Sequence, residues 1–267
     1  MSGTRRPARP PVVTTVAAVV AVAAFVTLVL ASGLPPAFAW RADILVSMTI
    51  GVALLALMVA GLLGLYEFDG PSSSRLLVAA GIGLVIAVAG SVLHVVALAD
   101  LGRIAFGGCV GLWLGFTLAD LSNDVRIVVG LAVGVGLLDA ASVFLPQGPT
   151  RLLLTKAPSA VPYFVVAFPT IGYRVSEAYS ALGTSDVIFF GLYLAAAVAF
   201  GLRVRLTLIA MSASFVVTVA LALYTRALPA LPLLSAAFLL VNADLLRARW
   251  RQAAAGHDEQ KGEDPPG

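Results

Sequence analysis

Long uninterrupted runs of apolar residues dominate the chain, and short polar or helix-breaking segments separate them. A membrane-spanning helix needs about 20 consecutive apolar residues. On that length, the pattern predicts eight helices, at about 12–32, 44–66, 76–98, 103–119, 126–145, 186–202, 206–225 and 229–246. The expected fold is therefore an all-α, polytopic transmembrane helix bundle.

One connection between the predicted helices, 146–183, is much longer than the others. It contains the segment 161–169, which is too short and too rich in proline to cross a membrane. Its β-branched and aromatic residues favour an extended conformation near the membrane interface. Two interpretations stay open: a re-entrant or interfacial packing segment, or an edge strand that receives an extended substrate by strand addition.

Composition supports the membrane class. The chain is 60% hydrophobic and only 12% charged, with a mean hydropathy of +0.99. A soluble domain of this size could not cover its surface with so few polar groups. We therefore expect a multi-pass protein of the cell membrane in contact with lipid.

The charge pattern excludes some partners and suggests an orientation. The net charge of +3 comes from short basic flanks, and no basic run alternates with aromatic residues, so no nucleic-acid surface is expected. With eight spans, 11 basic residues fall on the side of the two termini and 6 on the other. The positive-inside rule then predicts cytoplasmic termini.

The chain divides into four parts by composition. They are a basic N-terminal tail at 1–11, a scaffold bundle at 12–125, helices and linker of catalytic type at 126–246, and a disordered polar tail at 247–267. Ala37-Phe38-Ala39 resembles a signal-peptidase site, but the preceding apolar run is longer than usual for a signal peptide. We expect that first helix to be retained.

Glycines at every fourth position predict close helix packing. Gly107, Gly111 and Gly115 form one such ridge, and Gly130 and Gly134 form another. The single cysteine, Cys109, is interpreted as a small apolar filler within a helix. With one cysteine and two histidines the chain lacks a zinc ligand set, and no metal is expected.

Two aspartates interrupt apolar runs. Asp139 lies inside 127–145, and Asp186 opens the run 187–202. A charged side chain in hydrocarbon costs at least ~2.5–3.5 kcal/mol, so an intramembrane acid suggests a functional site. Taken singly, Asp186 is also explained as a helix N-cap after Thr184 and Ser185, and Asp139 as a buried acid hydrogen-bonded within the bundle.

Three short elements follow one another in the C-terminal half: Leu138-Asp139, Gly183-Thr184-Ser185-Asp186 and Pro229-Ala230-Leu231. Their order and spacing resemble the presenilin and signal peptide peptidase family of intramembrane aspartyl proteases. That family carries a Tyr-Asp motif, a Gly-x-Gly-Asp motif on the following helix, and a Pro-Ala-Leu motif at the start of its last helix. The resemblance covers roughly 127–246. It departs where Leu138 replaces the tyrosine and Ser185 replaces the second glycine. The family usually has nine helices, one more than the eight predicted here, so the helix count of eight or nine stays open.

The resemblance implies an endopeptidase that cleaves transmembrane peptide substrates with an Asp139/Asp186 dyad and needs no cofactor. Asp186, at a helix start, would serve as the base, and Asp139 as the proton carrier. The residues expected to bound this site are Gly183, Ser185, Pro229, Ala230 and Leu231.

Two other functions stay open. A small proton-coupled transporter also places acids at broken helices in the membrane. Such carriers often have two similar halves, and this chain shows no convincing internal repeat. The third candidate is a non-catalytic scaffold of presenilin-like descent.

Overall fold

A computed structural model describes residues 20–24, 27, 40–69, 73–122, 124–156, 161, 165–167, 181–225 and 228–262. The N-terminal tail, most of the predicted helix 12–32 and the Ala37-Phe38-Ala39 site lie outside these residues. So do 162–164 and 168–180 of the long connection.

The described chain is mostly helical, as predicted. Its elements in order are α2 (Trp40–Asp69), α3 (Ser73–Val92), α4 (Val96–Ser122), α5 (Val125–Phe144), α6 (Pro149–Lys156), β1 (Val165–Ala167), β2 (Ala181–Gly183), α8 (Thr184–Ala199), α9 (Val204–Thr225), α10 (Leu231–Val241) and α11 (Ala243–Gly262).

Five segments within the described residues are helical, long and apolar enough to cross a membrane: Ala42–Gly64, Ser74–Val92, Val96–Leu121, Val125–Leu153 and Val204–Ala222. A sixth span arises if α10 and α11, which meet at a bend of 71°, count as one. These helices suggest a membrane protein. The predicted count of eight is not confirmed, partly because α8 has only 16 residues. At 1.5 Å per residue that is about 24 Å, less than the ~30 Å hydrocarbon core.

The predicted boundary between the third and fourth helices is wrong. The break falls at Leu93–Val95, where His94 has a φ of 56°, and not near 99–102. Asp100 falls in the predicted gap at 99–102, and Arg103 at the predicted start of the next helix. They instead lie one turn apart on α4 and form an ion pair of 2.7 Å, which satisfies both charges inside a helix.

The predicted disorder after residue 246 is also wrong over most of its length. The chain continues as α11 to Gly262. This stretch is polar, but it is rich in alanine, arginine and glutamine, which have high helix propensity.

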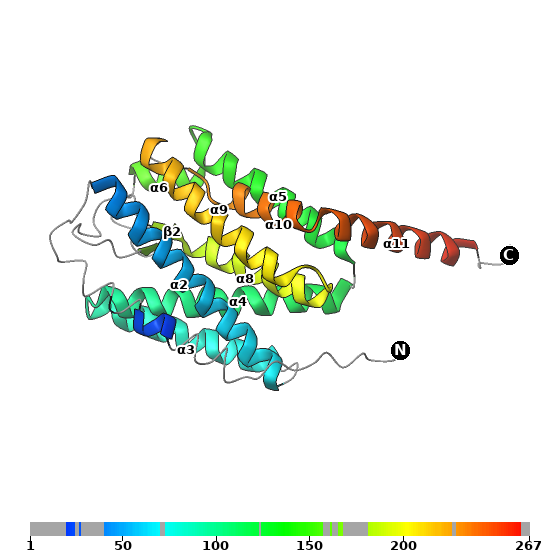
Figure 1. The fold of residues 1–267 in the computed structure, drawn as a ribbon, viewed down its shortest axis with the longest axis horizontal. Helices are drawn as coiled ribbons and strands as arrows, with labels where there is room; N and C mark the ends of the chain where they lie inside the picture. Colours follow the sequence, from blue (N-terminus) through cyan, green and yellow to red (C-terminus); the bar gives the residue numbers. More distant parts are fainter. Residues whose placement is uncertain are drawn as a thin grey trace.

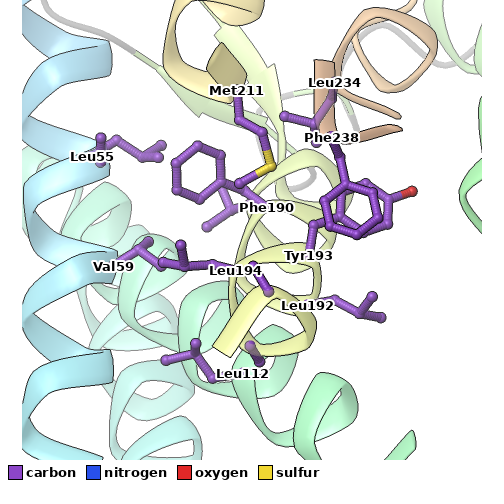
Figure 2. Packing of buried hydrophobic residues seen from close by; sticks show 14 of the residues in the cluster. Leu55, Val59, Leu112, Phe190, Leu192, Tyr193, Leu194, Met211, Leu234 and Phe238 are labelled. Carbon is purple, nitrogen blue, oxygen red and sulfur yellow. The ribbon is translucent and has the colours of Figure 1, made fainter. Parts of the chain in front are cut away.

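Helix α8 lies at the centre of the bundle, with α4 on one side and α9 and α10 on the other (Figure 1). Every residue from Phe190 to Val198 is buried. Figure 2 shows Phe190 and Tyr193 of α8 meeting Met211 of α9 and Phe238 of α10. The Tyr193 and Phe238 rings stack with their centroids 4.8 Å apart. The helix that carries Asp186 is therefore fixed on several sides.

One predicted glycine ridge packs and the other does not. A Cβ on Gly111 would lie 2.0 Å from the Ile188 carbonyl oxygen, so the glycine is required for the approach of α4 to α8. No described atom lies within 4 Å of the Cβ position of Gly130 or Gly134. The reason is that a different side of α5 packs against the bundle. That side includes the buried residues Ala132 and Gly136, and Gly136 lies next to α10.

Candidate active site

Asp186 is held at the point where a short sheet enters α8. Strands β1 and β2 pair antiparallel, with Val165 opposite Gly183. Gly183 is the N-cap of α8, and its N–H donates to Asp186 Oδ2 at 2.8 Å. This is the back-bond of a capping box, in which the third helical residue satisfies the N-cap amide. Asp186 is therefore not the N-cap itself, and it is buried, with 7% of its surface exposed.

Strand β1 confirms an extended conformation at residues 165–167 of the long connection. Its partner is β2 of the same chain. The pairing links the connection directly to the residues that lead into Asp186.

Asp139 lies on α5, five residues before the last residue of that helix, and is half-buried. Its Oδ2 accepts the backbone N–H of Leu231 at 3.1 Å. Leu231 begins α10, and an amide in the first turn of a helix has no partner within that helix. Asp139 thus caps a helix that lies 92 residues later in the chain.

Each carboxyl group therefore accepts a backbone amide at the start of a helix, Asp186 from the N-cap of α8 and Asp139 from the first residue of α10. Such a position also offers the positive end of the helix dipole to a carboxylate. Asp139 and Asp186 are close enough to interact electrostatically. The two acids come from separate helices, α5 and α8, which are otherwise almost wholly apolar.

A pocket of about 510 Å³ opens beside Asp139. Its lining is mostly apolar, and the polar side chains in it belong to Asp139, Ser142 and Gln147. The apolar walls include Leu138, which is 71% exposed. The full lining is Val135, Leu138, Asp139, Ala141, Ser142, Leu145, Gln147, Gly148, Pro149, Phe189 and Leu231. Asp186 is not part of the lining, so the pocket gives access to the Asp139 side of the acidic pair.

The residues expected to bound the site lie at different distances from the acids. Leu231 and Gly183 contact Asp139 and Asp186 through their amides. Pro229 and Ala230 are buried, and Ala230 is the N-cap of α10. Ser185 is exposed, and a Cβ on Gly183 would lie 3.1 Å from its Oγ.

Sequence reasoning missed two hydroxyl groups next to Asp139. Ser142 Oγ donates to the Asp139 carbonyl at 2.8 Å, lies 3.5 Å from Asp139 Oδ1, and shares a bond of 2.9 Å with Thr150 Oγ1. Ser142 follows Asp139 by one helical turn, so helix geometry could have identified it. Thr150 belongs to α6, and only the fold brings it there.

Metal ligands do not gather at this site: within the described residues, no group of three or more His, Cys, Asp or Glu side chains could hold an ion. Neither a scan against protein-family models nor a search of curated proteins found a match for the chain.

Proposed function

We propose that this protein is an intramembrane aspartic-type endopeptidase, with Asp139 and Asp186 as its catalytic pair. One observation carries the proposal. Asp139 accepts the Leu231 amide beside Pro229 and Ala230, and its carboxyl interacts with that of Asp186, so three distant segments converge at two acids.

The chemistry needs one proton shared between the two carboxyl groups, because two like charges in close contact cannot both ionise. The ionised carboxylate, assigned to Asp186, takes a proton from water as the water oxygen attacks the peptide carbonyl carbon. The protonated carboxyl, assigned to Asp139, donates its proton as the C–N bond breaks and the amine leaves. The pair then again holds one proton, and water has been added across the peptide bond.

The pocket suits an apolar peptide. Leu138, Phe189 and Leu231 offer apolar walls next to the Asp139 carboxyl, which lies on the accessible side of the pair. Apolar side chains that flank a scissile bond in a membrane segment would find matching surface there. Proteolysis of segments embedded in lipid, by a multi-pass protein of the presenilin-like type in a cell membrane, is the corresponding biological proposal.

Substitution of either acid by asparagine tests the proposal. The probes are quenched-fluorescent peptides with a single apolar segment of about 20 residues, presented in detergent micelles. We expect Asp139→Asn and Asp186→Asn each to abolish cleavage while the melting temperature stays near that of the wild type. Asp120→Asn is the matched control, since Asp120 is an exposed acid at the end of α4.

A peptide with a hydroxyl in place of the scissile carbonyl provides a second measurement. It imitates the tetrahedral intermediate and should bind the wild type much more tightly than the matching substrate peptide. Cleavage that persists in both asparagine variants would refute the dyad.

The same variants separate the protease from the carrier and the scaffold. If no peptide is cleaved and proteoliposomes show solute flux that requires Asp139, the protein is a carrier. Absence of both cleavage and flux favours the non-catalytic scaffold.

A further inference from the structure

A partly buried arginine joins three segments near the site. Arg103 on α4 donates through Nη1 to Asp100 Oδ1 at 2.7 Å and to the Val165 carbonyl of β1 at 3.2 Å. Its Nη2 donates to Ser91 Oγ, at the end of α3, at 3.2 Å. The Arg103 side chain is 13% exposed and that of Asp100 only 1%.

This geometry uses what is particular to arginine. The guanidinium is a rigid planar fork that can donate in several fixed directions at once, whereas a lysine ammonium is a compact point charge. Asp100 balances the charge and holds the plane, because a buried ion pair with good geometry compensates for loss of water. The remaining donors are thereby aimed at Val165 and Ser91.

From Arg103 a short series of contacts leads to Asp186. Val165, whose carbonyl Arg103 holds, is the register partner of Gly183 in the β1–β2 pair. The N–H of Gly183 in turn binds Asp186 Oδ2. A shift of β1 away from α4 would therefore be passed through β2 to the amide that holds the carboxylate.

We propose that Arg103 is a positioning residue for Asp186, oriented by Asp100 and acting through the Val165 carbonyl and the β1–β2 pair. The inference rests on the proposed protease function. The hydrogen bonds of Arg103 go to Asp100, Val165 and Ser91, and Arg103 does not line the pocket, so it acts through other residues and not on substrate.

The test compares Arg103→Gln, Arg103→Lys and Asp100→Asn in the full-length protein, with the same single-span peptides as probes. Arg205→Gln is the matched control, since it removes one exposed positive charge from α9. We expect Arg103→Gln to lower kcat by about tenfold and to change KM little, because the peptide still enters an unchanged pocket. Arg103→Lys keeps the positive charge and some of the N–H donors but loses the planar guanidinium. We therefore expect its kcat to lie between those of the wild type and Arg103→Gln.

Hydrogen exchange provides a readout that does not depend on catalysis. In Arg103→Gln, peptides that cover 165–167 and 181–183 should exchange faster, while the buried centre of α8 should exchange as in the wild type. A general loss of stability would instead raise exchange throughout the bundle and would contradict the proposal. If the glutamine variant fails to fold, Arg103→Lys and Asp100→Asn carry the same comparison.

The two proposals fail in different ways. If Asp139→Asn and Asp186→Asn are inactive but Arg103→Gln keeps wild-type kcat and exchange, the positioning role is overturned and the protease function stands. If the asparagine variants still cleave, the Asp139/Asp186 dyad is refuted. The positioning of the Asp186 segment would then be judged by exchange at 181–183 alone.

Discussion

At the scale of single residues, the two acids show how a carboxyl group can be kept in an apolar bundle. Each accepts a backbone amide at the start of a helix, Asp186 from the N-cap Gly183 and Asp139 from Leu231. Charge-assisted hydrogen bonds of this kind offset part of the loss of water around a carboxylate. The structural explanation and the catalytic one are compatible, because a carboxyl held by one amide still has lone pairs for water or a partner acid.

Ser142 provides a test at this scale. Ser142→Ala removes a hydroxyl near Asp139 Oδ1 and its bond to Thr150, and we expect kcat for peptide cleavage to fall about 3- to 10-fold. Ser212→Ala is the matched control. Ser212 also binds a carbonyl of its own helix, that of Leu208 at 2.7 Å, and lies on α9 outside the pocket lining. Equal effects of the two substitutions would contradict a role for Ser142 at the site.

At the scale of elements, the position of Asp186 depends on how α8 packs against α4. The two helices approach so closely that glycines are needed on both. Gly111 of α4 faces the Ile188 carbonyl, and a Cβ on Gly191 of α8 would lie 2.8 Å from the Gly108 carbonyl oxygen. Because the obstructing atoms belong to the backbone, a methyl group at either position must move a helix.

Gly111→Ala should therefore lower the melting temperature in detergent and reduce cleavage, since α8 carries Asp186 and cannot keep its place. Gly134→Ala is the matched control on α5, where no described atom lies within 4 Å of the new methyl group. There we expect no loss, or a gain of up to about 1 kcal/mol from the higher helix propensity of alanine. A neutral Gly111→Ala would show that α4 and α8 are not in rigid contact.

At the scale of the whole molecule, α10 is held at both ends by groups from other helices. Its first amide binds Asp139. At its other end, where the chain bends by 71°, Asn242 is fully buried. The Asn242 amide accepts the Arg203 N–H at 3.0 Å and donates to Thr207 Oγ1 at 2.8 Å. We attribute the bend to Asn242, because its side chain joins α9 to the junction of α10 and α11.

Asn242→Ala should destabilise the bundle by about 1–3 kcal/mol for each buried group left without a partner. Thermal melting in detergent measures the loss. The control is Asp244→Ala, which removes an exposed ion pair with Arg203 (2.7 Å) two residues beyond Asn242. We expect that substitution to change the melting temperature little, because solvent screens exposed pairs. If Asp244→Ala lowers the melting temperature more than Asn242→Ala does, this explanation of the bend is wrong.

Sequence patterns predicted the mostly helical bundle, the packing ridge through Gly111 and an extended segment over 161–169, of which 165–167 is a strand. They misplaced the start of α4, which runs through Asp100 and Arg103 because these two charges neutralise each other inside the helix. They also assigned a packing role to Gly130 and Gly134, since a small-residue repeat does not reveal which side of a helix meets a neighbour. The polar composition of 247–262 was read as disorder although its residues favour a helix.

The sequence by itself determined that the chain is mostly helical and which acids interrupt its apolar runs, because the length of an apolar run and the cost of buried charge are local properties of the chain. Only the tertiary structure decided that the Leu231 amide binds Asp139, that Thr150 approaches Ser142, and that Arg103 reaches the Val165 carbonyl. These contacts join residues from different elements, two of the three pairs being more than 60 positions apart. Helix packing brings such residues together, and no local pattern of residue types records that packing.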